Sequence, residues 1–127
     1  MLRSDDPEFQ KFGEIYFSKV YAGVVKAWHL HKEMTLNYLL VSGSIRLVLF
    51  DDRKGSMTEG CFQEIFLDES NSQLVSIPPL VWNGFKGLGI EASIVANCST
   101  IPHSPIEIER KAHDDSYFAY DWSQRHG

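Results

Sequence analysis

The stretch NYLLVSGSIRLVLFDD, residues 37–52, consists of two runs of β-forming residues joined at Ser42-Gly43-Ser44. This join has the composition of a tight turn between two strands. In the second run Ile45, Leu47 and Leu49 alternate with three other residues, so one face of the expected strand is strongly apolar. Residues 37–52 therefore predict two β-strands that help to form an apolar core.

The same pattern continues through most of the chain. From residue 12 to residue 100, short β-rich runs recur between turn signals, and we count roughly eight strands at the spacing of sandwiches and barrels. No segment of ten or more residues keeps a helical period. A chain of 127 residues is large enough for one core. We predict a single all-β domain at 12–100, preceded by an N-terminal arm at 1–11 and followed by a tail at 101–127.

The tail is densely aromatic in the segment SYFAYDW, residues 116–122. Tyr117, Phe118, Tyr120 and Trp122 carry too much apolar area to remain in water. Two placements are open. The aromatic side chains cover the chain's own barrel, or they pack on the other subunit of a dimer.

Composition argues against two classes of partner. The net charge of −5 argues against nucleic acid, because phosphates require a basic surface. The sequence has no run of about 18 apolar residues, so no membrane span is expected. The N-terminal segment MLRSDDPEFQ is acidic, whereas a signal peptide begins basic and continues apolar. We therefore expect a cytoplasmic protein.

The segment VVKAWHLH, residues 24–31, carries two histidines one residue apart. On a regular strand His29 and His31 point to the same side, together with the small residues at 25 and 27, and Lys26 points to the other side. Two imidazoles beside small residues suit the lining of a cavity. Lys26 can reach the same ligand only if the strand is bulged or twisted there.

A metal site can be tested against the sequence. The spacing of Gly23, His29 and His31 resembles the first motif of metal-binding cupins, but Thr35 and Leu36 occupy the positions of the glutamate ligand. The second cupin motif, P-x-G-x-x-H, reads PPLVWN at residues 78–83, with asparagine in place of the histidine ligand. A stable transition-metal site generally needs three or four protein ligands. We therefore expect no metal and no other cofactor.

Three segments, in order, resemble the dTDP-4-dehydrorhamnose 3,5-epimerase family, a group of metal-free cupins. VVKAWHLH is similar to the family's R-G-L-H segment, with Lys26 for its arginine and His29 for its catalytic histidine. LFDDRKGSMTEG, residues 49–60, matches the family's D-x-R-x-x-S-x-T loop. SNSQLVSIPPLVWNGFKGL, residues 70–88, is similar to its N-x-x-x-L-x-x-P-x-G-x-x-H-G-F segment. The chain looks like a short, single-domain member of this family.

The resemblance implies a fold and an activity. The fold is a cupin jelly roll, or double-stranded β-helix, that forms a homodimer and binds a nucleotide-diphospho 4-keto-6-deoxy sugar. The activity is proton abstraction at C3 and C5, beside the 4-keto group, in deoxysugar or polysaccharide biosynthesis. His29 would be the base, and Lys26 would hold the enolate oxygen or a phosphate. His103 would be the acid that returns a proton.

The resemblance also implies residues that hold the substrate. His31, Asn83 and Trp28 would contact the sugar. Arg46 and Arg53 are the candidates for the diphosphate, since guanidinium groups pair well with phosphate oxygens.

The chain departs from the family on its late strand. The segment SIVANCST, residues 93–100, has no tyrosine where the family has its proton donor. Losing a general acid typically lowers a rate by about 10²–10⁴-fold without removing binding. Two alternatives to an epimerase therefore stay open: a non-catalytic cupin subunit that binds a sugar or nucleotide, and a metal-dependent cupin enzyme.

Overall fold

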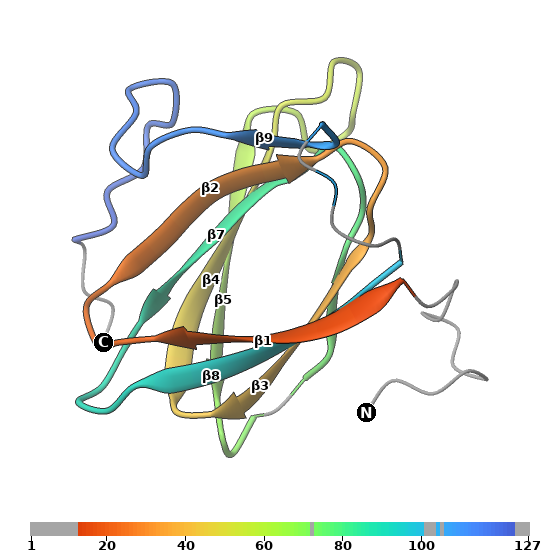
Figure 1. The fold of residues 1–127 in the computed structure, drawn as a ribbon. Helices are drawn as coiled ribbons and strands as arrows, with labels where there is room; N and C mark the ends of the chain where they lie inside the picture. The colour runs from red at the N-terminus through yellow and green to blue at the C-terminus, as the bar shows by residue number, and fades with distance from the viewer. Residues whose placement is uncertain (1–12, 72, 101–103, 105, 124–127) are drawn as a thin grey trace.

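The computed structural model describes residues 13–71, 73–100, 104 and 106–123. The described residues form two facing antiparallel sheets without helices, which confirms the predicted all-β jelly roll (Figure 1). The four-stranded sheet has the order β1-β8-β3-β6, and the five-stranded sheet has the order β5-β4-β7-β2-β9. The strands are β1 (Glu14–Val20), β2 (Val25–His31), β3 (Leu36–Ser42), β4 (Ser44–Asp51), β5 (Cys61–Asp68), β6 (Val75–Ile77), β7 (Trp82–Gly87), β8 (Ser93–Ser99) and β9 (Ile108–Arg110).

The turn at Gly43 passes the chain from one sheet to the other. β3 pairs with β8 and β6, whereas β4 pairs with β5 and β7. Gly43 has φ of +89°, and a Cβ at this position would lie 2.3 Å from Oγ of Ser93. Only glycine combines this backbone conformation with so close an approach. The two predicted strands are therefore joined by a corner between sheets.

The space between the two sheets holds the main apolar core. Ile45 and Leu47 are fully buried there and Leu49 packs against them, as the alternation in residues 37–52 predicts. The other buried members of this core are Val20, Met34, Leu36, Tyr38, Leu40, Leu67, Ile77, Val81, Phe85 and Val95. Three members of this core, Met34, Tyr38 and Phe85, also line the cavity described below.

A second apolar cluster covers the outer face of the five-stranded sheet. Phe118 and Trp122, from the tail, pack on Trp28, and the ring centroids of Trp28 and Phe118 lie 4.4 Å apart in a stacked arrangement. The structure thus places these tail aromatics on the chain's own sheet. Because the tail covers this face, β4 is buried on both sides, and its Val48 is as inaccessible as Leu47.

The predicted N-terminal arm, residues 1–11, and His103 fall outside the described residues. In the part of the chain that the structure describes, no helix is long and apolar enough to cross a membrane.

Candidate functional site

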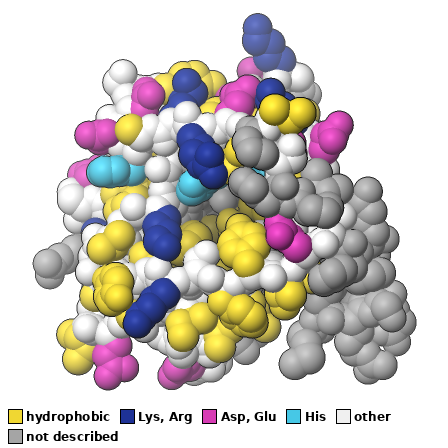
Figure 2. All heavy atoms as spheres, viewed as in Figure 1, with side chains coloured by type: hydrophobic (Ala, Val, Ile, Leu, Met, Phe, Trp, Pro, Cys, Tyr) yellow, Lys and Arg dark blue, Asp and Glu magenta, His cyan; other side chains and the backbone are white. Residues whose placement is uncertain are grey.

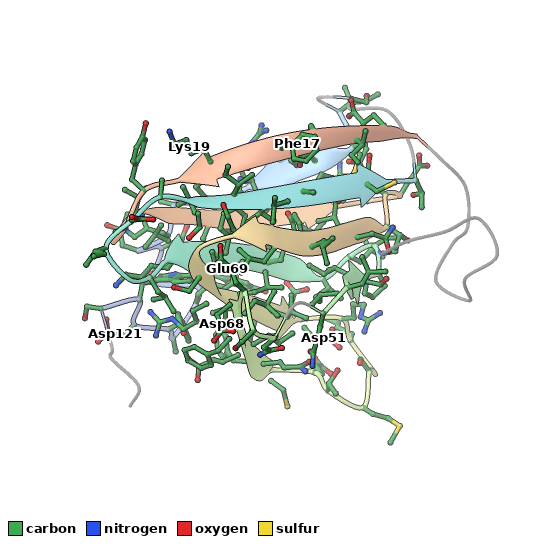
Figure 3. All side chains as sticks on the ribbon, turned by 90° about the horizontal axis from the view of Figure 1, so that it is seen from below. Phe17, Lys19, Asp51, Asp68, Glu69 and Asp121 are labelled. Carbon is green, nitrogen blue, oxygen red and sulfur yellow. The ribbon has the colours of Figure 1, made fainter. Side chains whose placement is uncertain are left out.

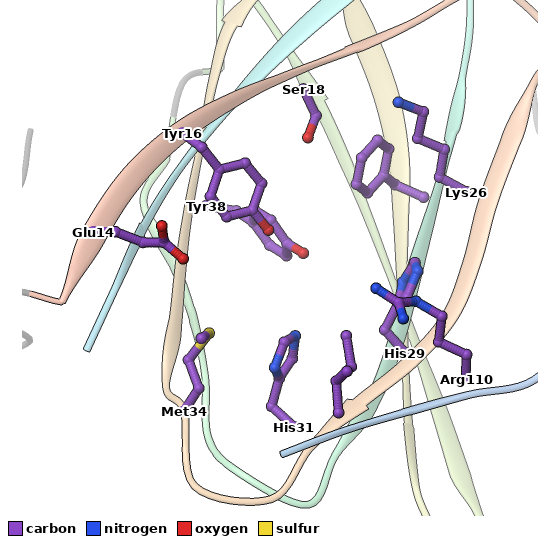
Figure 4. A pocket seen from close by; sticks show the side chains of 11 residues that line it. Glu14, Tyr16, Ser18, Lys26, His29, His31, Met34, Tyr38 and Arg110 are labelled. Atoms are coloured by element: carbon purple, nitrogen blue, oxygen red, sulfur yellow. The ribbon is translucent and has the colours of Figure 1, made fainter. Parts of the chain in front are cut away.

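A cavity of about 180 Å³ opens between the two sheets (Figure 4). Its lining comes from β1, β2, the connection between β2 and β3, β3, β7 and β9. It consists of Glu14, Tyr16, Ser18, Lys26, His29, His31, Met34, Tyr38, Phe85, Ile108 and Arg110. Pockets that enclose drug-sized ligands usually hold about 300–1,000 Å³. This cavity therefore suits one part of a larger ligand.

An irregularity in β2 brings Lys26 to the same side as the two histidines. The register between β2 and β7 shifts between Ala27 and His29, as in a β-bulge. Lys26, His29 and His31 consequently all line the cavity, whereas Ala27 packs on the outer aromatic cluster. The expectation that small residues at 25 and 27 share the histidine face was wrong, because it assumed a regular strand.

Gly84 and Asn83 of β7 support this part of β2. A Cβ on Gly84 would lie 2.3 Å from Cβ of Ala27, so only glycine permits this approach of the strands. Asn83 is 1% exposed and does not line the cavity. Its side-chain amide donates to the backbone carbonyl of His29 at 3.2 Å, and its oxygen accepts from the Tyr38 hydroxyl at 3.4 Å. Asn83 therefore holds cavity residues in place, where the sequence predicted a sugar contact.

His31 pairs with a carboxylate that the sequence analysis did not identify. Nδ1 of His31 lies 2.5 Å from Oε1 of Glu107, and both side chains are buried. The other oxygen of Glu107 accepts from the backbone N–H groups of Glu33 and Met34, each at 3.0 Å. Burial alone would raise the pKa of Glu107, but these hydrogen bonds and His31 lower it below its ordinary value. The Glu107 side chain is therefore a carboxylate next to His31.

His29 has a different environment. Arg110 is paired with His29 across β9 and β2, and both side chains line the cavity. Burial, together with the positive charges of Arg110 and Lys26 and the neighbouring His31, lowers the pKa of His29 from 6.5 to about 4. His29 is therefore a neutral imidazole at physiological pH. On the face shown in Figure 2, histidine atoms are visible next to Lys and Arg side chains.

Two tyrosines line the opposite side of the cavity (Figure 4). Tyr16 on β1 and Tyr38 on β3 both pair with Asn97, one from each side of β8. The Asn97 side-chain amide donates to the Tyr16 hydroxyl at 3.1 Å. β8 itself has no tyrosine, but β1 and β3, the strands on either side of it, each place a tyrosine next to Asn97.

Three predicted ligand residues lie away from this cavity. Arg46 is 1% exposed on the outer face of the five-stranded sheet, where its guanidinium donates to the Trp122 carbonyl. Trp28 is fully buried in the aromatic cluster on the same face. Arg46 and Trp28 therefore do not line the cavity, because the tail covers both side chains.

The third of these residues, Arg53, follows β4 and forms a bidentate pair with Asp51, at 2.9 and 3.0 Å. Figure 3 shows Asp51 far from Phe17 of β1, the strand that contributes Glu14, Tyr16 and Ser18 to the cavity. Arg53 instead borders a separate hollow beside β5. The structure therefore does not bring Arg53 together with the two histidines.

Three residues that line the cavity, Arg110, Tyr16 and Tyr38, were not predicted from the sequence, nor was Glu107, which contacts His31 from behind the lining. For Tyr16 a signal existed, because alternation along residues 14–20 places it on one face with Glu14 and Ser18. Among the described residues, no three side chains of His, Cys, Asp and Glu gather as a metal site would require.

Comparison with known proteins identifies the family. The model of the dTDP-4-dehydrorhamnose 3,5-epimerase family matches residues 5–126. The chain belongs to this family. Among its epimerase-family relatives, a Haloferax volcanii protein described as a "probable low-salt glycan biosynthesis epimerase" is 36% identical, over 97% of this chain and 81% of the relative. The spore coat polysaccharide biosynthesis protein SpsL of Bacillus subtilis is 29% identical, over 97% of this chain and 83% of the relative.

The epimerase family also provides a similar solved structure. The crystal structure of a dTDP sugar isomerase from Desulfovibrio desulfuricans superposes with a TM-score of 0.96 at 42% identity, covering 99% of this chain and 81% of that chain. This chain therefore shares the epimerase family's fold over nearly its whole length.

One epimerase-family motif has a structural role here. In the D-x-R-x-x-S-x-T loop, Asp51 accepts hydrogen bonds from the side chains of Arg53, Ser56 and Thr58. The hydrogen bond from Arg53 is the main reason that the pKa of Asp51 lies well below its ordinary value. The motif thus stabilises the loop between β4 and β5 through hydrogen bonds within the loop.

Proposed function

We propose that this chain is a nucleotide-sugar epimerase that acts on a dTDP-linked 4-keto-6-deoxy sugar. The observation that carries the proposal is a cavity with imidazoles on one side and phenols on the other. Membership of the epimerase family supports it, as do relatives named as an epimerase and a dTDP sugar isomerase. The names of two relatives also support a role in glycan or polysaccharide biosynthesis. A cytoplasmic location remains a prediction from the sequence.

Epimerisation beside a ketone needs groups on both faces of the sugar. A base removes the proton at C3 or C5, the electron pair moves to the ketone oxygen as an enolate, and an acid returns a proton to the other face. A hydrogen-bond donor or cation must stabilise the enolate. The histidines of β2 supply the base side, and His29, Lys26 and Arg110 supply donors or positive charge.

Tyr16 is the proposed acid. Its hydroxyl accepts a hydrogen bond from Asn97, which leaves its own proton to be donated into the cavity. The Tyr38 hydroxyl instead donates to Asn83. His103, the acid predicted from the sequence, lies outside the described residues, and its role remains a prediction.

The nucleotide would extend out of the cavity, because about 180 Å³ lies below the volume of pockets that enclose whole ligands of that size. Lys26 and Arg110 are the cations that line it, and we propose them for the diphosphate. They replace Arg46 and Arg53 in that role.

We also propose that two copies of the chain form a homodimer through the outer face of the four-stranded sheet. Ile15, Phe17 and Val41 on this face are between 51% and 65% exposed, and Phe17 lies opposite Ala96 of β8. Exposed apolar strips of this kind mark interaction surfaces, and a two-fold dimer can cover the same strip on both copies. Light scattering should give a dimer mass that falls to a monomer mass in Phe17→Lys. A monomeric wild type would refute this proposal.

The activity is tested by proton NMR of dTDP-4-keto-6-deoxyglucose in deuterated water. We expect the C3 or C5 proton signal to disappear with the protein, and no exchange with dTDP-glucose, which has no ketone to acidify those positions. A ketosugar that binds, as judged by line broadening, but does not exchange would instead support a non-catalytic binding protein.

A further inference from the structure

The pairing of His31 with Glu107 determines which ring nitrogen of His31 can accept a proton. The two residues are 76 positions apart, and Nδ1 of His31 contacts the carboxylate at 2.5 Å. A carboxylate accepts hydrogen bonds and does not donate them, so the ring proton must lie on Nδ1. In the neutral ring, Nε2 then carries the lone pair. Figure 4 shows the His31 ring directed into the cavity.

The Glu107 carboxylate is itself held rigidly. Its second oxygen accepts from the backbone N–H groups of Glu33 and Met34, and only 6% of the residue is exposed. A buried carboxylate on the far nitrogen fixes the imidazole tautomer and stabilises the imidazolium that forms when Nε2 takes a proton. His31 therefore has the support that a general base requires.

His29 lacks that support. It faces the positive charges of Arg110 and Lys26, and among the described residues none hydrogen-bonds its ring. Its pKa, lowered to about 4, means that it holds an added proton poorly. A neutral histidine of this kind is suited to donate a hydrogen bond to a carbonyl oxygen and remain neutral.

We propose that His31, positioned by Glu107, is the base of this site, and that His29 donates a hydrogen bond to the ketone oxygen. This inference rests on the proposed function. It moves the role of base from His29, where the family resemblance placed it, to His31, for which the resemblance implied only a sugar contact. The C–H bond beside the ketone breaks, its proton moves to Nε2 of His31, and its electron pair forms the enolate held by His29. Tyr16 protonates the opposite face, and exchange with water restores the imidazole and the phenol.

The charged and titratable groups around His31 are those that line the cavity with it, together with Glu107, its hydrogen-bond partner. They come from β1, β2, β3 and β9 and from the segment that precedes β9: Glu14, Tyr16, Lys26, His29, Tyr38, Glu107 and Arg110. Glu107 is the one of these that contacts the His31 ring.

Glutamine substitutions distinguish a base from a donor, because an amide can donate a hydrogen bond but cannot take up a proton. For His31→Gln we expect deuterium exchange into dTDP-4-keto-6-deoxyglucose to fall by about 10²–10⁴-fold, with ligand line broadening retained. For His29→Gln we expect deuterium exchange to fall by no more than about tenfold, since the glutamine amide can still donate a hydrogen bond to the ketone oxygen. His113→Gln, on the exposed tail, is the matched control.

Glu107→Gln tests the positioning role separately. The amide would donate to Nδ1, move the ring proton to Nε2 and so remove the base. We expect exchange to fall by about 10²–10⁴-fold, as for the wrong tautomer in a serine protease. Nitrogen-15 NMR of labelled histidines should then show His31 change from the Nδ1–H to the Nε2–H tautomer. A purely structural role for Glu107 predicts that exchange survives this change of tautomer.

The outcomes separate this inference from the proposed function. A folded His31→Gln that exchanges normally, or a His29→Gln that loses exchange while His31→Gln keeps it, would overturn the assignment of the base. An Nε2–H tautomer of His31 in the wild type would overturn it even if a variant failed to fold. Absence of exchange in the wild type would instead overturn the epimerase proposal itself.

Discussion

Replacing Tyr16 by phenylalanine should separate proton removal from inversion. The change deletes one hydroxyl and leaves the ring on β1 in place, so the base and the enolate-binding groups remain. Loss of a general acid lowers a rate by about 10²–10⁴-fold, which corresponds to about 2.7–5.5 kcal/mol of transition-state free energy. We expect epimer formation to fall by that factor while deuterium exchange stays within about tenfold of wild type.

The same substitution has a predictable effect on stability. Asn97 is 1% exposed, and its side-chain amide would lose the Tyr16 oxygen as its acceptor. Leaving one buried donor unpaired costs about 1–3 kcal/mol, so Tyr16→Phe should still fold. Urea denaturation measures this cost.

Exchange and inversion are read from one proton NMR time course in deuterated water. Tyr117→Phe, which removes an exposed hydroxyl in the tail, is the matched control and should change neither rate. If Tyr16→Phe lowers the rates of deuterium exchange and of epimer formation equally, Tyr16 is not the acid. If epimer formation keeps its wild-type rate, Tyr16 is not the acid either.

Three further predictions concern stability. Asp51→Asn should destabilise the protein at neutral pH. Because folding lowers the pKa of Asp51, the wild-type protein loses this stabilisation as the pH falls below about 4, and the two proteins should then approach the same free energy of unfolding. Urea denaturation of both proteins between about pH 7 and pH 2.5 measures this. Gly84→Ala should cost about 1–3 kcal/mol or more, because its methyl group would overlap Ala27, and Ala27→Gly should restore part of the loss in urea denaturation. Trp122→Ala should cost about 3–5 kcal/mol by removing an indole ring packed on Trp28; an unchanged denaturation midpoint would show that the tail does not stabilise the sheet.

The fold was predictable because its main signals are local. The alternation in residues 37–52 and the turn at Gly43 follow from short-range sequence, and both are present in the structure. The sequence could not show that this turn changes sheets, because that depends on the contact of Gly43 with Ser93 on a distant strand. Burial of Arg46 was unpredictable for a related reason: the residues that cover it come from the tail, 76 positions away.

The candidate site was only partly predictable. His29, His31 and Lys26 could be found because they lie close together in one segment, and the sequence analysis noted the bulge that Lys26 would need. Glu107 and Arg110 join them only because β9 pairs with β2, and no local pattern indicates that pairing. Tyr16 and Tyr38 were not predicted, because they come from two other strands and lie next to β8 only through strand pairing, which places both opposite Asn97.

A crystal structure of the chain with bound dTDP-rhamnose would test the central claim most directly, because it locates the sugar relative to both sides of the cavity. We predict that the hexose lies between His31 and Tyr16, with the diphosphate near Lys26 and Arg110. A hexose bound instead in the hollow beside Arg53, with the histidine cavity empty, would contradict the account.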